Sequence, residues 1–178
     1  GHDGTIYAST FGREPFLAAF DPKSGTERWR FHTQPGDGDF YGVQSGALVD
    51  GEGYIYFGGR DGFVYCLTPG GALVWRYETG DQVDAGPVLG PDGTLYIVDM
   101  YRGIIQEGNW VRKGSYLRGV VQEYGLDQNI GRGRIYRLVH EAHEPGPRPR
   151  MLDESSQQLV AHLAHPNGWW RDNAQKLL

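Results

Sequence analysis

The strongest constraint on the fold of this sequence is an internal repeat. Residues 25–33 and 71–79 both read Gly-x-x-x-Trp-Arg-aromatic-x-Thr, and their tryptophans, Trp29 and Trp75, are 46 positions apart. Repeats of roughly 40–50 residues that combine short strands with Gly, Pro and Asp turns are typical of β-propeller blades, each a four-stranded antiparallel sheet. The repeat therefore predicts a mainly β chain built from propeller blades.

A second pattern indicates the number of blades. A Gly-x-hydrophobic-Tyr strand occurs at residues 4–7, 53–56 and 93–96. Three copies predict about three blades, and closed propellers have typically 4–8 blades. We therefore expect residues 1–139 to form a partial β-propeller. The chain also opens in strand-like sequence and stops in helix-like sequence, so we expect it to be a piece of a longer protein.

Composition and charge agree with a turn-rich β protein. The chain has 28 glycines, and 13% of its residues are aromatic. Residues 1–100 hold 6 basic and 14 acidic side chains, whereas residues 101–137 hold 7 basic and 3 acidic ones. A nucleic-acid surface needs a broad basic face, so this distribution argues against nucleic acid. The basic segment could receive a small anion, a carboxylated cofactor or an acidic partner, or could be a solvated loop.

The single cysteine excludes several kinds of site. With Cys66 alone, no internal disulfide or zinc cluster can form, and no Cys-x-x-Cys-His motif attaches a c-type haem. Cys66 lies in an apolar strand, so we expect a buried, inert thiol. No signal peptide and no membrane-spanning apolar run is recognisable. His162 and His165 lack a third ligand nearby in sequence, so no metal site is predicted.

The sequence changes character after the third strand. A basic and aromatic insert covers residues 107–129, with a short helix expected near its end, and residues 131–139 alternate like a strand. Three prolines predict an extended linker over residues 140–150. Residues 151–178 then predict a helical hairpin, in which Ser155 forms a capping box and Asn167 caps the second helix.

The blade motif resembles a known propeller family. Its Gly-x-x-x-Trp element is similar to the pyrroloquinoline-quinone-like repeat, in which the tryptophan is structural and packs between neighbouring blades. The resemblance implies that Trp29 and Trp75 dock blades rather than bind a ligand. It does not imply the quinone cofactor, because many propellers with this repeat are scaffolds.

The second half of the chain resembles another group of proteins. Residues 99–106 and 131–137 are similar to the propeller end of large bacterial, haem-binding, membrane-associated quinoprotein-type dehydrogenases, and the likeness covers residues 94–178. Those proteins continue into HEAT-type helical repeats and a cytochrome c domain. The resemblance implies that the hairpin is the start of a HEAT-like repeat. It also implies a periplasmic or cell-envelope location, and the partners would be the remaining blades and HEAT repeats of the parent chain.

The same resemblance suggests cofactors and contacts. The parent protein could bind pyrroloquinoline quinone (PQQ), and haem only if a further C-terminal domain carries it; no cofactor is evident in this segment. Basic side chains hold the carboxylates of such a quinone. The candidate contacts are Arg102, Arg112, Lys113, Arg132 and Arg134. The alternative for each is a salt bridge at a blade edge, and no catalytic residue of the family maps onto this chain.

Two functions from different classes follow. The first is a propeller fragment of a quinoprotein-type, cytochrome-linked sugar or alcohol dehydrogenase that is inactive alone. The alternative is a non-catalytic propeller scaffold that binds protein or carbohydrate partners. This segment has no recognisable group of catalytic residues, so the sequence does not decide whether the protein is an enzyme.

Overall fold

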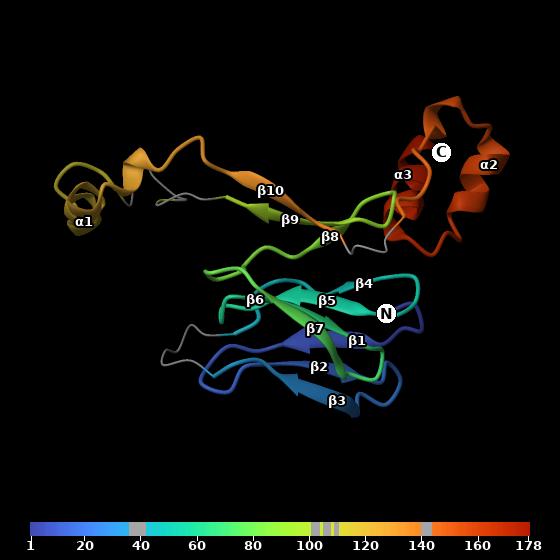
Figure 1. Cartoon of the computed structure of the whole chain (residues 1–178), viewed down its shortest axis with the longest axis horizontal. Helices are drawn as coiled ribbons and strands as arrows, with labels where there is room; N and C mark the ends of the chain where they lie inside the picture. The colour runs from blue at the N-terminus through green and yellow to red at the C-terminus, as the bar shows by residue number, and fades with distance from the viewer. Residues whose placement is uncertain (36–41, 101–103, 105–107, 109–110, 140–143) are drawn as a thin grey trace. The chain divides into compact units, whose positions relative to one another are not determined.

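The computed structural model describes residues 1–35, 42–100, 104, 108, 111–139 and 144–178 (Figure 1). The described chain is mainly β, with three antiparallel sheets followed by a helical hairpin. The predicted fold class, a partial β-propeller with C-terminal helices, is confirmed.

Each sheet corresponds to one copy of the repeat. Blade 1 has the order β1 (Ile6–Ser9), β2 (Phe16–Phe20) and β3 (Glu27–His32). Blade 2 has the order β4 (Leu48–Val49), β5 (Ile55–Gly58), β6 (Phe63–Leu67) and β7 (Leu73–Glu78). Blade 3 contains β8 (Val88–Leu89), β9 (Leu95–Asp99) and β10 (Arg134–Leu138), with β9 in the middle.

Only blade 2 shows the expected four strands among the described residues. In the repeat, β1 is equivalent to β5 and β2 is equivalent to β6. Among the described residues, blade 1 therefore has no counterpart of β4. Blade 3 has counterparts of β4, β5 and β6 but none of β7. The residues 144–150 that follow blade 3 carry three prolines, which cannot donate to a strand ladder.

Blades 1 and 2 share one hydrophobic core. Leu17 of β2 is buried together with Ile55, Phe57, Tyr65 and Leu67 of blade 2. A larger set from β1, β3 and the β4 region packs against them: Tyr7, Trp29, Phe31, Ala47 and Val49. Phe57 and Tyr65 stack with ring centroids 5.0 Å apart. Because both sheets contribute to this cluster, the two blades stabilise each other.

The turns that precede β1 and β9 are built alike. In blade 1 the backbone N–H and the hydroxyl of Thr5 both donate to Asp3, at 3.0 and 2.7 Å. In blade 3 Thr94 donates in the same way to Asp92, at 3.1 and 2.9 Å. Gly4 and Gly93 adopt φ values of 83° and 81°, which glycine tolerates best. The Asp-Gly-Thr triplet therefore forms a hydrogen-bonded turn before the strand in blades 1 and 3.

Contacts divide the chain into two compact units, residues 1–97 with 137–178 and residues 98–136. The smaller unit contains α1 (Tyr116–Tyr124) and the short 3₁₀ helix η2 (Leu126–Gln128). The Ser115 side chain caps α1 by accepting from the Arg118 N–H, and Gly125 ends it in the left-handed conformation at φ 61°. The short helix predicted in the insert is confirmed.

The helical hairpin consists of η3 (Met151–Asp153), α2 (Ser156–His162) and α3 (Gly168–Leu177). The predicted capping box is present, with Ser155 and Gln158 exchanging hydrogen bonds, and Asn167 caps α3. Its own core has four buried residues: Met151, Leu159, Trp170 and Ala174.

The hairpin is fixed to blade 3 through two backbone carbonyls. The Asn167 side chain donates to the carbonyl of Gly90 at 2.7 Å, and the Trp170 indole donates to that of Pro91 at 2.9 Å. Both carbonyls belong to the β8–β9 turn. Among the described residues, none of the helices is both long and apolar enough to cross a bilayer.

Candidate functional site

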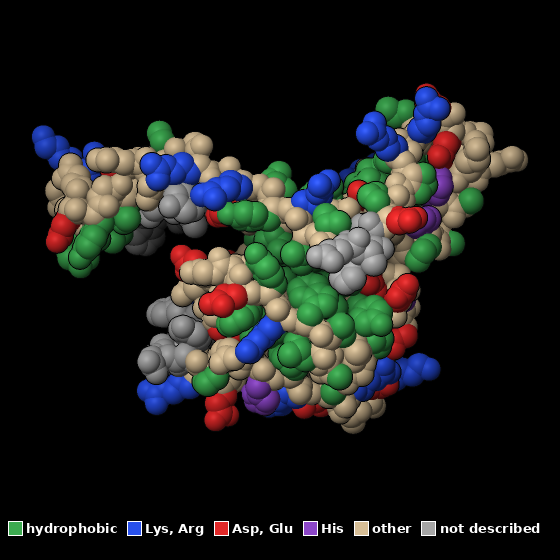
Figure 2. Space-filling view, in the orientation of Figure 1, with side chains coloured by type: hydrophobic (Ala, Val, Ile, Leu, Met, Phe, Trp, Pro, Cys, Tyr) green, Lys and Arg blue, Asp and Glu red, His purple; other side chains and the backbone are tan. Residues whose placement is uncertain are grey.

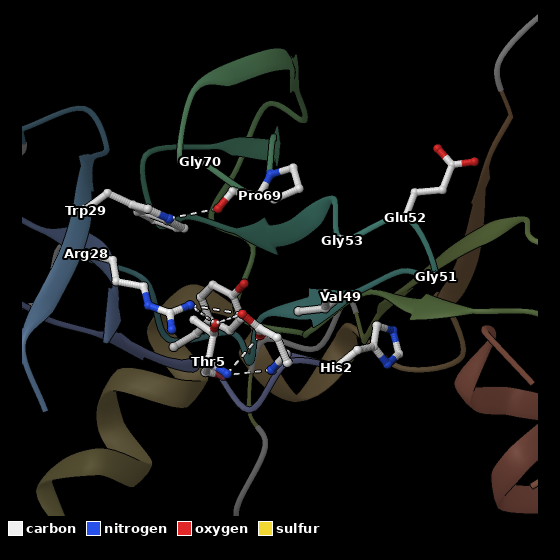
Figure 3. Close-up of a pocket in the computed structure, with 13 residues that line it drawn as sticks. His2, Thr5, Arg28, Trp29, Val49, Gly51, Glu52, Gly53, Pro69 and Gly70 are labelled. Atoms are coloured by element: carbon white, nitrogen blue, oxygen red, sulfur yellow. Dashed lines mark hydrogen bonds and ion pairs between the residues drawn. The ribbon is translucent and has the colours of Figure 1, made fainter. Parts of the chain in front are cut away.

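One hollow lies where blades 1 and 2 meet (Figure 3). It has a volume of about 450 Å³ and is open to solvent. The turn before β1, strand β3 and the β4–β5 and β6–β7 turns contribute its lining. Polar groups and a tryptophan in one groove are typical of a ligand-binding site. Whether this groove can bind a ligand depends on which of these side chains already have hydrogen-bond partners within the protein.

Arg28 is the only Lys or Arg among the residues that line this hollow, and its guanidinium makes three hydrogen bonds within blade 1. Its guanidinium donates to Asp3 at 2.9 Å, to the Thr5 hydroxyl at 2.7 Å and to Asp21 at 2.8 Å. Hydrogen bonds from Thr5 and then from Arg28 hold the pKa of Asp3 well below its usual range. The hydrogen bond from Arg28 does the same for the pKa of Asp21. The cluster is therefore a permanently charged clamp within blade 1, with no group positioned to exchange a proton near neutral pH.

Trp29 is half-buried at the edge of this hollow, and its ring is held against blade 2. Its indole N–H donates to the carbonyl of Pro69 in blade 2 at 2.9 Å, as Figure 3 shows. A Cβ placed on Gly71 would lie 2.5 Å from the Trp29 ring, so the bare glycine backbone lies directly against the indole. Tyr7 approaches the ring from the same blade, with centroids 5.9 Å apart. The blade-docking role predicted for Trp29 is confirmed.

Trp75, the equivalent tryptophan of blade 2, has different contacts. It packs on Tyr56, with ring centroids 6.0 Å apart. Within the part of the chain that the structure describes, no carbonyl accepts from its indole N–H. Its predicted docking role therefore stays a prediction.

The second hollow, of about 220 Å³, lies between the end of β3 and blade 2. Asp61 organises its rim by accepting from the Tyr65 hydroxyl at 2.5 Å and from the Gln34 N–H at 2.9 Å. Burial raises the pKa of Tyr65, so the phenol remains protonated and a donor. Arg76 lies over the Phe63 ring, 4.7 Å from its centroid. The hydrogen bond from Gln34 to Asp61 thus joins the segment after β3 to blade 2, whereas the other two contacts lie within blade 2.

The predicted quinone contacts lie elsewhere. Arg112 and Lys113 are exposed in the segment before α1, and Arg132 and Arg134 are exposed at the start of β10. Arg134 donates to the Tyr136 hydroxyl at 3.1 Å. Arg102 lies outside the described residues.

The structure thus brings four of the five candidates into one compact unit, residues 98–136, but not around an enclosed cavity. Neither described hollow is lined by them. A planar tricarboxylate such as PQQ needs a cradle with converging cations. The described residues do not form that cradle, so they support no reaction step.

The side chains that could ligate a metal ion are the next feature of the described residues. Among the described residues, no three His, Cys, Asp or Glu side chains lie close enough to bind a metal ion. His162 pairs with Glu154 at 2.8 Å and lies against Trp170, with ring centroids 4.9 Å apart. Burial raises the pKa of the Cys66 thiol to about 11, so this group is a protonated core residue.

Sequence reasoning missed two sets of residues that matter here. The Asp3–Arg28–Asp21 clamp joins positions far apart in the sequence, and only the repeated Asp-Gly-Thr triplet hinted at part of it. The contacts of Asn167 and Trp170 with blade 3 had no sequence signal beyond the helix cap.

Comparison with known proteins gives a match to one short family model and distant similarities to solved structures, two of which follow. Residues 86–142 match a family described as a domain of unknown function, DUF7133. A europium-containing methanol dehydrogenase is similar with 25% identity and a TM-score of 0.39, over 47% of this chain and 14% of that one. BamB from Moraxella catarrhalis is similar with 22% identity and a TM-score of 0.39, over 49% of this chain and 32% of that one. No curated protein matches the chain.

Proposed function

We propose that this chain acts as a propeller scaffold, which holds blades together and presents attached segments to a protein partner. The observation that carries the proposal is the Trp29 joint. The indole of blade 1 is anchored to the Pro69 carbonyl and to the bare backbone of Gly71 in blade 2. The most distinctive residue of the repeat is therefore used for assembly.

The charged groups beside this joint support the same function. Arg28 donates to Asp3, Thr5 and Asp21, and Asp61 accepts from Tyr65 and Gln34. A catalytic base needs a lone pair that can face a substrate and a pKa near the working pH. Arg28 and Asp61 are instead held by their neighbours, which suits a rigid support.

The test is an oxidation assay on the purified 178-residue chain. We expect no dye-linked oxidation of sugars or primary alcohols when PQQ and calcium are supplied. A quinoprotein dehydrogenase assayed in the same mixture serves as the positive control. Turnover above the protein-free blank with any of these substrates would contradict the scaffold function.

A second candidate is a segment of a quinone-dependent, cytochrome-linked sugar or alcohol dehydrogenase of the periplasm or cell envelope. The observation in its favour is that Arg112, Lys113, Arg132 and Arg134 belong to one compact unit. In such an enzyme they would bind quinone carboxylates, and the quinone would accept the hydride. The HEAT-like character of the hairpin belongs to the same proposal.

This candidate has its own binding test. PQQ is titrated into the chain and into a variant with Arg132→Gln and Arg134→Gln, with calorimetry as the readout. The control is Arg30→Gln, because Arg30 pairs with Glu27 at 2.6 Å on β3, outside the unit. Binding that the double variant loses and the control retains would favour the dehydrogenase. Equal heats for all three proteins would exclude these contacts.

A further inference from the structure

Two histidines of the hairpin pack on the tryptophan that anchors it to blade 3. The ring centroids of His162 and His165 lie 4.9 and 5.3 Å from that of Trp170. Trp170 is buried, and its indole donates to the Pro91 carbonyl of the β8–β9 turn. Both histidines are half-buried, and Figure 2 shows His side chains at the surface of the hairpin beside acidic ones. Solvent can therefore supply a proton to these rings.

The hydrogen bond of His165 determines which of its nitrogens carries the proton. The backbone N–H of Asn167 donates to Nδ1 of His165 at 3.0 Å. A backbone N–H can only donate, so Nδ1 is a bare acceptor and the neutral ring carries its proton on Nε2. This hydrogen bond exists only while His165 is neutral.

Asn167 connects the His165 ring to blade 3. Its side-chain oxygen accepts from the Trp169 N–H at 2.9 Å and caps α3, and its side-chain nitrogen donates to the Gly90 carbonyl at 2.7 Å. The residue is 8% exposed, so these groups have little access to water. The bond from its backbone to His165 thus fixes the residue that both begins α3 and holds the β8–β9 turn.

A second proton on His165 is unfavourable in these surroundings. Nδ1 would become a donor and would point at the N–H of Asn167. The ring also precedes the N-terminus of α3, where the helix dipole disfavours a cation. Arg171 adds a positive charge, because its guanidinium donates to the carbonyls of His165 and Pro166.

His162 responds in the opposite way. Its Nε2 pairs with Glu154 at 2.8 Å, and a proton on this ring strengthens the pair. Trp170 attracts either charged ring, and so do Glu52 and Asp92, which lie in the β4–β5 and β8–β9 turns. These groups do not distinguish the two histidines, whereas the hydrogen-bond partners do. Among the described residues, the other histidines, His2 and His32, lie in blade 1.

We propose that the turn between α2 and α3 is an acid-sensitive latch, in which protonation of His165 releases Asn167 and loosens the hairpin from the β8–β9 turn. Histidine is the side chain whose charge ordinarily changes between about pH 5 and 8, so mildly acidic solution is sufficient. The hairpin is one of the attached segments of the proposed scaffold. The inference therefore rests on that function and adds its regulation.

The experiment follows the ¹⁵N-labelled full chain by nuclear magnetic resonance at pH 7.5 and 5.0. The imidazole nitrogen shifts report where His165 carries its proton, and at pH 7.5 we expect Nε2 alone. Hydrogen-exchange protection of the Trp170 indole N–H, relative to an unstructured peptide at the same pH, reports docking of the hairpin. We expect this protection to fall about fivefold at pH 5.0, because one hydrogen bond is lost. Protection of the β6 amides in blade 2 should not change.

Two variants separate the histidines. In His165→Asn the side-chain oxygen can accept from the Asn167 N–H at either pH, so protection of the Trp170 indole should stay constant. His162→Gln is the matched control, because it removes the neighbouring titrating ring from the same indole and keeps a donor for Glu154. It should lose at least as much protection at pH 5.0 as the natural chain, since the opposing response is gone.

Several results would overturn the inference. A proton on Nδ1 of His165 at pH 7.5 would do so from the natural chain alone, whether or not a variant folds. Undiminished Trp170 protection at pH 5.0, or an equal loss in His165→Asn, would do the same. A loss shared by β6 would mean that acid unfolds the whole chain, and a loss that His162→Gln removes would assign the response to His162. None of these results bears on the oxidation assay, so the scaffold function fails or stands separately.

Discussion

At the scale of single residues, the same motif position has different surroundings in the two blades. Gly25 and Gly71 both open the Gly-x-x-x-Trp motif, and both adopt positive φ, 69° and 82°. A Cβ on Gly25 would meet nothing within 4 Å, whereas one on Gly71 would collide with Trp29. The chain therefore contains its own control for the contribution of the blade joint.

We expect Gly71→Ala to be clearly more destabilising than Gly25→Ala. Both substitutions carry the strain of a side chain at positive φ, about 1 kcal/mol. Only Gly71→Ala also displaces the indole, which should add roughly 1–3 kcal/mol of overpacking cost. Urea unfolding of both variants measures the difference. Equal losses of unfolding free energy would mean that the Trp29 contact does not stabilise the chain.

Cys66 predicts how stability responds to alkaline pH. Its pKa is about 11 in the folded chain against an ordinary value of 9.0, because burial disfavours the thiolate. The contribution is therefore fully present below pH 9 and is lost as the pH rises from 9 through 11. Burial also raises the pKa values of Tyr56 and Tyr65, and these phenols act in the same direction at higher pH.

The measurement is the free energy of unfolding at pH 7, 9, 10 and 11 for the natural chain and for Cys66→Ala. We expect the natural chain to lose about 2 kcal/mol more than the variant between pH 9 and 11. Parallel curves for the two proteins would show that the thiol has an ordinary pKa in the folded state.

At the scale of elements, the hairpin depends on close contact with two consecutive blades. Asn167 and Trp170 donate to the β8–β9 turn, and Pro166 lies against Gly51 in the β4–β5 turn. A Cβ on Gly51 would lie 2.6 Å from the Cβ of Pro166. The hairpin thus recognises the same turn in blades 2 and 3.

We expect Gly51→Ala to loosen the hairpin while the blades stay folded. The added methyl group forces Pro166 away, and hydrogen bonds at the neighbouring turn weaken with it. Limited proteolysis should cut residues 144–150 several-fold faster than in the natural chain. Gly46→Ala is the matched control, because nothing lies within 4 Å of its added Cβ. Identical cleavage of both variants would argue against docking through Gly51.

The elements also show which features a sequence can predict. Periodicity predicted the strands, the helix that begins at Tyr116 and the strand within residues 131–139, because side-chain alternation is local. The Ser155 capping box and the Asn167 cap were predictable for the same reason. Among the described residues, blade 3 has no counterpart of β7, and the repeat alone did not predict this. The prolines of residues 144–150 are consistent with it, because proline cannot donate to a strand ladder.

The candidate site was less predictable than the fold. Arg28 reaches Asp3 across 25 positions, and no local pattern reports such a pair. Only their charge and the family resemblance indicate the candidate cations. Whether such side chains converge depends on loop geometry, which has no periodic signal. The structure gathers four of them in one unit without closing a cavity.

At the scale of the whole molecule, blades 1 and 2 are held together by one shared core. Leu17 of blade 1 is buried with Ile55, Phe57 and Leu67 of blade 2, and Trp29 closes the joint. Sheets that share a core open together, whereas sheets that merely lie side by side open separately. The cooperativity of opening therefore tests the scaffold more directly than any single stability value.

The decisive measurement is native-state hydrogen exchange of β2 and β6 in the natural chain and in Trp29→Ala, with Trp75→Ala as the comparison. We expect β2 and β6 to exchange with one common opening free energy, which Trp29→Ala lowers equally in both strands by about 2–4 kcal/mol. Trp75→Ala should lower it less, because its indole has no described carbonyl partner. Separate opening free energies, with Trp29→Ala affecting β2 alone, would contradict the account.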